Sequence, residues 1–406
     1  MSRPVAYLTS VYPAVSHTFI SREVRALRAR GMDVHTFTIR RAPAGALVSG
    51  EDREEAARTS AILPIEVSSL LRHHLAAAGR HPVRYAMTML TALAMSPGGA
   101  RATLWQLFYF AEAIELWSRC EARGIRHIHA HFANVASAVA MLAARFGAAE
   151  GASWSFTMHG QTEFDDVSRY ALAEKVDSAR FVACISDYCR SQLMRHVSPQ
   201  HWDKLTIVRC GLELQSSRPP ERQATDPERF AILCVGRLVP DKGQVLLLEA
   251  VAELRRRGLD AHLTLVGDGP DRRRLESERQ RADLGAVVTL CGSLNQAQIH
   301  DLLAHSDVFC LPSFAEGLPV VIMEAFAAAV PVVTTRVGGI AELVEDGRSG
   351  ALVAPGRVDL LVDALARVAA DRELARAWGE NGRARVVAQH DITHSARQLA
   401  ELFAGA

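Results

Sequence analysis

Two glutamates in the second half of the chain, Glu316 and Glu324, are separated by seven residues. Glu316 follows the apolar run Val308–Leu311, which is typical of a buried parallel strand, and Glu324 lies in a predicted helix that ends before Pro331. Open α/β sheets bind ligands at such strand ends, because loop amides and a helix amino end converge there. The spacing alone leaves a second interpretation open, in which both are solvated glutamates.

A pair of basic residues follows another predicted strand. The run Phe230–Val235 is followed at once by Gly236 and Arg237, and Lys242 comes shortly after them. Glycine lets the backbone approach a ligand closely, and two cations at the amino end of the next helix favour a diphosphate. We expect alanine at Arg237 or Lys242 to slow catalysis strongly and to leave the fold intact.

His159 comes directly after the predicted buried strand Trp154–Met158. A titratable side chain therefore stands at the ligand edge of a sheet in the first half of the chain as well. His129 and His131 also lie near a strand end. Because side chains along a strand alternate between its faces, we expect at least one of these two to be structural.

Taken together, these segments resemble the retaining family-4 glycosyltransferases, whose proteins have the two-domain GT-B fold. The resemblance rests on the E-x7-E signature, on Glu-Gly-Leu-Pro from Glu316, on Gly-Arg-Leu-x-x-x-Lys-Gly at 236–243 and on Gly-Gly-Ile-Ala-Glu at 338–342. It is strongest over 230–355 and weakest over 41–125. Near the amino terminus, Ser-x-Thr-Phe-Ile followed by Arg-Glu-Val resembles the subgroup associated with colanic acid and other exopolysaccharides, although the family's glycine-rich turn is missing.

The resemblance implies roles for individual side chains. Arg237 and Lys242 would bind the diphosphate of a nucleotide sugar, with the amides near Gly317. Glu316 would hold hydroxyls of the donor sugar, Glu324 the ribose hydroxyls, and His159 would face the donor sugar. The implied catalytic residues are His159, Arg237, Lys242 and Glu316. The implied donor-binding residues are Gly236, Arg237, Lys242, Gly267, Ser293, Leu294, Glu316, Gly317, Leu318 and Glu324.

The loop after the first predicted strand carries candidate acceptor-binding residues, namely Ser16, His17 and Thr18. Ser16 and Thr18 could donate hydrogen bonds to an acceptor or a phosphate at the helix amino end. The alternative is that they only cap the helix.

Alternating strands and helices predict an α/β fold with two Rossmann-like, doubly wound domains that face each other across a cleft. We expect a first domain over 1–214, with a helical insertion at about 51–125, and a second domain over 229–390. The polar, proline-bearing stretch 215–228 reads as the linker. The last helix, in 391–406, is expected to cross back to the first domain.

The insertion is rich in Leu, Ala and Met, carries Arg72, Arg80 and Arg84, and has an aromatic cluster at Trp105–Phe110. One interpretation is an interfacial face for a membrane-linked acceptor, with cations that meet anionic headgroups. The other is a helical layer that only packs on the sheet.

The composition limits the class of protein. The chain has 406 residues and a formal net charge of +1, from 46 basic and 45 acidic side chains, which argues against a nucleic-acid binder held by bulk charge. Its seven scattered cysteines indicate a reducing compartment. Without a signal-peptide core or a long apolar segment, a cytoplasmic protein is expected, peripheral at the inner face of the cell membrane if the insertion binds lipid.

The expected function is transfer of a sugar from a nucleoside-diphosphate sugar with retention of the anomeric configuration. A UDP-linked donor is expected ahead of a GDP-linked one. The acceptor would be a saccharide, a lipid-linked saccharide or a small molecule, in exopolysaccharide or secondary-metabolite synthesis. No metal or other cofactor is expected, since the adjacent pair Asp165 and Asp166 is no Asp-x-Asp motif. The alternatives are an epimerase or phosphorylase of the same fold and an inactive partner that binds nucleotide sugar.

Overall fold

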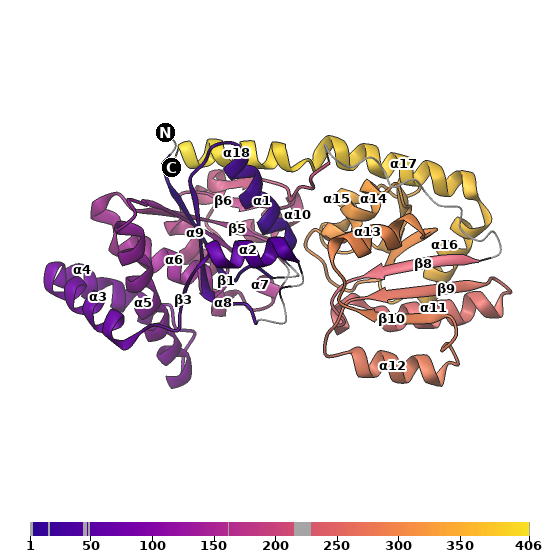
Figure 1. Ribbon diagram of the computed structural model, residues 1–406, viewed down its shortest axis with the longest axis horizontal. Helices are drawn as coiled ribbons and strands as arrows, with labels where there is room; N and C mark the ends of the chain where they lie inside the picture. Colours follow the sequence, from indigo (N-terminus) through magenta and orange to yellow (C-terminus); the bar gives the residue numbers. More distant parts are fainter. Residues whose placement is uncertain are drawn as a thin grey trace. The chain divides into compact units, whose positions relative to one another are not determined.

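The computed structural model describes residues 3–14, 17–43, 47, 49–160, 162–214 and 229–405. The chain divides into two compact units (Figure 1). Unit 1 is Met1–Gly211 together with Ile392–Ala406, and unit 2 is Leu212–Asp391. The predicted linker 215–228 lies outside the described residues.

Unit 1 is built on a parallel sheet that has seven strands within the described residues. These are β1 (Val5–Val11), β2 (Val34–Arg40), β3 (Ser60–Leu63), β4 (His127–His131), β5 (Ser153–Met158), β6 (Val182–Cys184) and β7 (Leu205–Ile207). Their order across the sheet is β3-β2-β1-β4-β5-β6-β7, so the direction of winding reverses between β1 and β4. Apolar side chains fill both faces of such a sheet, because the crossover helices cover both.

The helices of unit 1 connect these strands and cover the sheet (Figure 1). They are α1 (Thr18–Ala29), α2 (Gly50–Arg58), α3 (Val67–Arg80), α4 (Pro82–Ala94), α5 (Ala100–Glu121), α6 (Val135–Phe146), α7 (Thr162–Asp165), α8 (Val167–Tyr170), α9 (Leu172–Ser178), α10 (Asp187–Met194) and α18 (Ile392–Ala404). Figure 1 shows α3, α4 and α5 gathered at one end of this unit.

The predicted helical insertion needs a correction, because it contains a strand. Strand β3 pairs in parallel with β2, with Phe37 opposite Ser60. Of its four residues only Ile62 is buried. A run of four residues at a sheet edge shows no clear alternation of buried and exposed side chains. It is a strand because it pairs with β2. The helical layer proper is α3 to α5.

The last helix, α18, packs within unit 1 although it follows unit 2 in the sequence. Its residues Ala396, Leu399 and Phe403 share an apolar core with Tyr7 of β1 and Val24 of α1. The carboxyl-terminal segment therefore completes the core of the unit that the amino terminus begins.

Unit 2 is a second parallel sheet, with six strands within the described residues and the order β10-β9-β8-β11-β12-β13. These strands are β8 (Phe230–Val235), β9 (Ala261–Val266), β10 (Val288–Gly292), β11 (Val308–Leu311), β12 (Val332–Thr335) and β13 (Gly350–Val353). The helices are α11 (Gln244–Arg256), α12 (Arg272–Arg281), α13 (Gln296–Ala304), α14 (Val320–Ala327), α15 (Ile340–Leu343), α16 (Val358–Ala370) and α17 (Arg372–Gln389). The prediction of two Rossmann-like α/β domains is confirmed.

Candidate functional site

The candidate donor site of unit 2 lies where the winding of its sheet reverses. Strands β8 and β11 are neighbours, but the chain leaves β8 toward β9 and leaves β11 toward β12, on opposite sides. The loops after these two strands therefore diverge, and a crevice forms at such a switch point. Arg237 and Lys242 lie on the loop after β8, and Glu316 on the loop after β11.

Lys242 and Glu316 form an ion pair between these two loops. Lys242 Nζ donates to Glu316 Oε1 at 2.5 Å, and the Ser313 hydroxyl donates to the same oxygen at 2.7 Å. Glu316 is only 6% exposed, so its charge requires these partners. Both of these hydrogen bonds end on Oε1, so that among the residues that the structure describes Oε2 is left for a ligand.

A glycine lets the two loops touch. Gly243 has φ +63°, and a Cβ there would lie 2.2 Å from the carbonyl oxygen of Pro312. Phe314 N donates to Asp241 O at 2.7 Å across the same contact. Only glycine permits this close approach, and the approach brings Lys242 within reach of Glu316.

A second glycine aligns the neighbouring loop. Gly267, after β9, has φ +133°, and a Cβ there would lie 2.0 Å from Gly236 O. Its amide donates to Gly292 O at 2.8 Å, directly before the exposed Ser293 and the half-buried Leu294. The predicted donor-binding positions after β8, β9 and β10 thus lie on adjoining loops.

The remaining predicted donor residues differ in exposure. Arg237 is exposed at the end of β8, whereas Glu324 is 4% exposed within α14. Leu318 is buried, and Gly317 O accepts from Gly339 N at 2.9 Å. Arg237 is therefore exposed to solvent at the switch point, whereas Glu324 is buried.

Unit 1 places the predicted acceptor residues at its own switch point, between β1 and β4. Ser10 Oγ, in β1, donates to Asn134 Oδ1 after β4 at 3.1 Å. His17 is the N-cap of α1 without a side-chain cap bond, and its ring lies 5.0 Å from that of Phe132. Thr18 is the first residue of α1. Ser16 lies outside the described residues, so its predicted role has no structural description.

His159 follows β5 and is held by other rings. Its Nε2 lies 2.9 Å from His131 Nδ1, and its ring centroid is 4.7 Å from Phe19 and 4.6 Å from Phe132. Burial, followed by the neighbouring His131 and His17, lowers the pKa of His159 well below its usual value. The His159 imidazole is therefore neutral near pH 7.

The expectation that at least one of His129 and His131 is structural holds for His129, but the alternation of faces is not the reason. Residues two apart share a face of a strand, and both are fully buried. His129 Nδ1 and Nε2 lie 2.8 and 2.9 Å from the hydroxyls of Ser155 and Thr157. His129 is thus part of a structural network, whereas His131 contacts a predicted site residue.

The sequence reasoning missed Ser313 and Glu23 as site partners. Ser313 stood next to the predicted signature, but only the fold shows that its hydroxyl holds Glu316. Glu23 was noted only within an Arg-Glu-Val run, and it pairs with His131 from a distant part of the chain. Asp166 accepts from Arg169 N at 3.2 Å and caps α8.

Part of the chain, within unit 2, matches a known protein family. Residues 217–385 match the model of the family described as glycosyl transferases group 1. No helix in the described part of the chain combines the length and the hydrophobicity needed to cross a bilayer.

Three curated bacterial relatives match part of the chain. The alpha-D-kanosaminyltransferase of Streptomyces kanamyceticus is 30% identical over 59% of this chain and 64% of its own length. A GDP-mannose-dependent alpha-(1-6)-phosphatidylinositol monomannoside mannosyltransferase of Mycolicibacterium smegmatis is 33% identical over 59% of this chain and 66% of its own. The putative colanic acid biosynthesis glycosyltransferase WcaL of Escherichia coli is 34% identical over 54% and 55%. The chain thus spans less than two thirds of the length of these relatives.

Solved structures show the same fold over the whole chain. HepE from Anabaena, solved in complex with UDP, has a TM-score of 0.74 at 16% identity and covers all of both chains. Sucrose-phosphate synthase from Thermosynechococcus elongatus has a TM-score of 0.74 at 23% identity and covers 99% of this chain and 98% of its own. Both similarities concern the fold.

Proposed function

We propose that this chain, whose residues 217–385 match the group 1 family of glycosyl transferases, is a member of that family and transfers a sugar from a nucleoside-diphosphate sugar to a hydroxyl acceptor. The observation that carries the proposal is the Lys242–Glu316 pair at the β8/β11 switch point, with Arg237 exposed on the same loop as Lys242. These groups offer cations for a diphosphate and a carboxylate oxygen for sugar hydroxyls.

In the proposed reaction, the bond between the anomeric carbon and the diphosphate oxygen breaks, and a bond from the acceptor oxygen to that carbon forms on the same face. The acceptor proton passes to the leaving phosphate oxygen, so the configuration is retained. Arg237 and Lys242 stabilise the charge on the departing diphosphate, helped by the amides of Gly317 and Leu318. Glu316 orients the sugar through Oε2, and Glu324 accepts hydrogen bonds from the ribose.

The proposal extends to the base of the donor and to the acceptor. We propose a UDP-linked donor in preference to a GDP-linked one, and the UDP complex of HepE supports this choice. The relative named as GDP-mannose-dependent supports a guanine base instead. Ser16, His17 and Thr18 would contact the acceptor. Relatives named for colanic acid and kanosamine support a saccharide, a lipid-linked saccharide or a small molecule as acceptor, in exopolysaccharide or secondary-metabolite synthesis.

A thermal-shift screen against UDP, GDP and their sugars tests the donor assignment. A ligand at 100 times its Kd stabilises the folded state by about 2.7 kcal/mol, which is readily measured. An inactive partner would show the same shift without turnover, and an epimerase would change the donor sugar without releasing nucleoside diphosphate. The two basic residues and the two glutamates of unit 2 favour the transferase over both.

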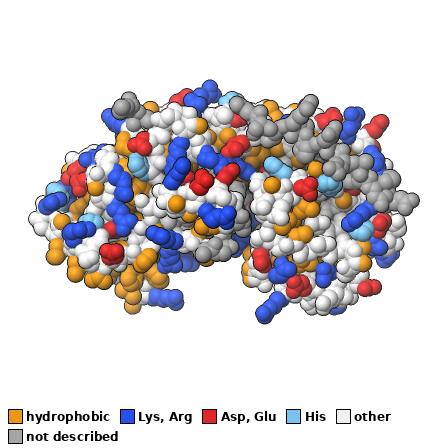
Figure 2. Space-filling view, in the orientation of Figure 1, with side chains coloured by type: hydrophobic (Ala, Val, Ile, Leu, Met, Phe, Trp, Pro, Cys, Tyr) orange, Lys and Arg blue, Asp and Glu red, His pale blue; other side chains and the backbone are white. Residues whose placement is uncertain are grey.

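We further propose that α3, α4 and α5 bind an anionic membrane surface on the cytoplasmic side. From Val67 to Ala111 the sequence has four Arg and three His and no acidic residue. Figure 2 shows hydrophobic and basic side chains together at the end of unit 1 that carries these helices. The exposed apolar side chains there are Val67, Leu71, Leu75, Val83, Met87, Leu90, Leu104, Trp105, Leu107 and Phe108.

The apolar residues follow the helical repeat. Val67, Leu71 and Leu75 form one stripe of α3, and Val83, Met87 and Leu90 one stripe of α4. Apolar stripes beside arginines are typical of helices that lie in the headgroup region of a bilayer. A reducing location agrees with the seven cysteines, all of them free.

Glutamate at Leu71, Leu75 and Val83 together is expected to weaken binding to vesicles that contain phosphatidylglycerol at least about tenfold, because it removes apolar contact and adds repulsion. Sedimentation with vesicles measures this effect. The matched control is Val387→Glu in α17, which is 45% exposed outside the face. Equal binding by the wild type and the triple variant would contradict the proposal, as would a dimer in solution that the triple variant disrupts.

Activity is expected to survive EDTA, because Arg237 and Lys242 supply the positive charge that a metal would otherwise provide. Rates measured with EDTA, and again after addition of magnesium or manganese, check this expectation. An enzyme that EDTA silences and magnesium restores would show that the diphosphate is held by a metal.

A further inference from the structure

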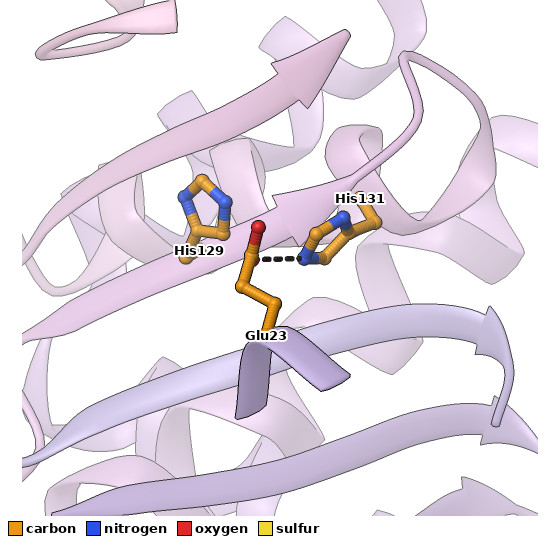
Figure 3. A group of neighbouring side chains, drawn as sticks. All are labelled: Glu23, His129 and His131. Carbon is orange, nitrogen blue, oxygen red and sulfur yellow. Dashed lines mark ion pairs between the residues drawn. The ribbon is translucent and has the colours of Figure 1, made fainter. Parts of the chain in front are cut away.

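A chain of hydrogen-bonding groups leads from the interior of unit 1 to His159. The Tyr7 hydroxyl donates to Glu23 Oε1 at 3.0 Å, and the same oxygen lies 3.2 Å from His131 Nε2. His131 Nδ1 lies 2.9 Å from His159 Nε2. Figure 3 shows Glu23 reaching His131 from helix α1. Four elements thus contribute to one line of contacts: β1, α1, β4 and the loop after β5.

The groups behind His159 are buried, so their partners determine where the protons lie. Tyr7 is 1%, His131 0% and Glu23 8% exposed. Burial raises the pKa of Tyr7 well above its usual value, and the Glu23 charge adds to this effect. Tyr7 therefore keeps its proton and serves Glu23 as a donor.

The position of each proton follows along the chain. The contact of 3.2 Å between His131 Nε2 and Glu23 Oε1 does not have the geometry of a hydrogen bond, but a carboxylate can only accept, so this contact favours a proton on Nε2. In a neutral ring, His131 Nδ1 is then an acceptor, and His159 Nε2 must carry the proton between the two rings. A neutral His159 protonated on Nε2 has a lone pair on Nδ1.

Two further features fix the orientation of the ring. Phe19 and Phe132 pack on His159, and Phe132 has φ +68°, an unusual value for a residue with a side chain. The loop after β4 that contains Phe132 is held by Lys175, whose Nζ donates to Ala133 O at 2.8 Å. Such local strain persists where the surrounding structure enforces it.

We infer that Glu23 and His131 are positioning residues that hold His159 in the tautomer with an unprotonated Nδ1, ready to accept a hydrogen bond from a substrate hydroxyl. The inference rests on the proposed function and on the role that the family resemblance implies for His159, which would face the donor sugar. Within the described residues, Nδ1 of His159 has no hydrogen-bond partner of its own. In many sites a carboxylate that contacts one nitrogen of a histidine ring fixes the tautomer and the orientation of that ring.

A metal ion is the other way to use this cluster. Glu23, His129 and His131 offer ligand atoms within 4.8 Å of one another. Both nitrogens of His129, however, already contact the hydroxyls of Ser155 and Thr157. His131 Nδ1 is likewise occupied by His159. The line of contacts from Tyr7 to His159 accounts for these distances without a cation.

The first test is the ¹⁵N spectrum of the histidine rings, assigned by comparison with His159→Gln. It requires no substrate, so it separates this inference from the proposed function. We expect protonated Nε2 and bare Nδ1 on His159 in the wild type, and a mixture of tautomers in Glu23→Leu. A His159 protonated on Nδ1 in the wild type would overturn the inference, and so would zinc binding that Glu23→Gln abolishes.

The second test compares two substitutions of Glu23. Glu23→Leu keeps the volume but removes the acceptor, and we expect kcat to fall on the order of tenfold to a hundredfold with unchanged affinity for nucleoside diphosphate. Glu23→Gln can place an amide oxygen at the Oε1 position, and it should recover most of this loss.

The Glu23→Leu effect should vanish in a His159→Ala background, because Glu23 acts only through His159. A penalty that persists there would show that Glu23 matters only for packing. Thermal unfolding of each variant confirms that it is folded. If the wild type turns over no nucleotide sugar while its His159 has the expected tautomer, the proposed function fails and the positioning chain stands.

Discussion

Alanine at Arg237 or Lys242 is expected to lower kcat about a hundredfold or more, because both charges stabilise the diphosphate as it leaves. The magnitude corresponds to removing one preorganised donor from an oxyanion site. Steady-state rates with the donor found by thermal shift measure the effect. Near-normal rates in both variants would show that the diphosphate binds elsewhere.

The two variants should differ in stability. Arg237 is exposed, and its loss should leave the unfolding temperature nearly unchanged. Lys242 neutralises Glu316, which is 6% exposed, so Lys242→Ala leaves a buried carboxylate without its cation and costs about 1–3 kcal/mol. Both variants are still expected to fold, as the sequence predicts, with Lys242→Ala the less stable of the two. The matched control is Lys242→Ala combined with Glu316→Gln, which should recover stability but not turnover.

Glutamine at Glu316 and at Glu324 is expected to have different effects. Glu324 is assigned to the ribose, which does not change during the reaction, so Glu324→Gln should weaken binding of the donor and of free nucleoside diphosphate alike. Glu316 is assigned to the sugar. Glu316→Gln should lower turnover and relax the choice of donor, with little change in nucleoside-diphosphate affinity. Calorimetric titration beside steady-state rates separates the two, and equal loss of affinity in both variants would contradict the division of roles.

Much of the fold could be predicted from local sequence. The apolar run Phe230–Val235 coincides with β8, and the run Val308–Leu311 with β11, because patterns of several residues reflect burial directly. The edge strand Ser60–Leu63 escaped prediction because it is short, and Ile62 alone of its residues is buried.

Contacts between distant residues could not be predicted in the same way. Lys242 and Glu316 are 74 residues apart, and their pairing depends on β11 lying beside β8. The contact of Glu23 with His131 depends in the same way on α1 packing over the β1–β4 junction. Family resemblance named Lys242 and Glu316 as separate ligands of the donor, whereas the fold shows that each also holds the other.

The most direct test of the account is the release of nucleoside diphosphate from UDP-linked and GDP-linked sugars, measured with EDTA present and with or without saccharide acceptors. The account predicts release that an acceptor accelerates, with transfer of the sugar in the same amount and loss of both in Arg237→Ala. A wild-type protein that binds nucleoside diphosphate but releases none from any of these donors would contradict it.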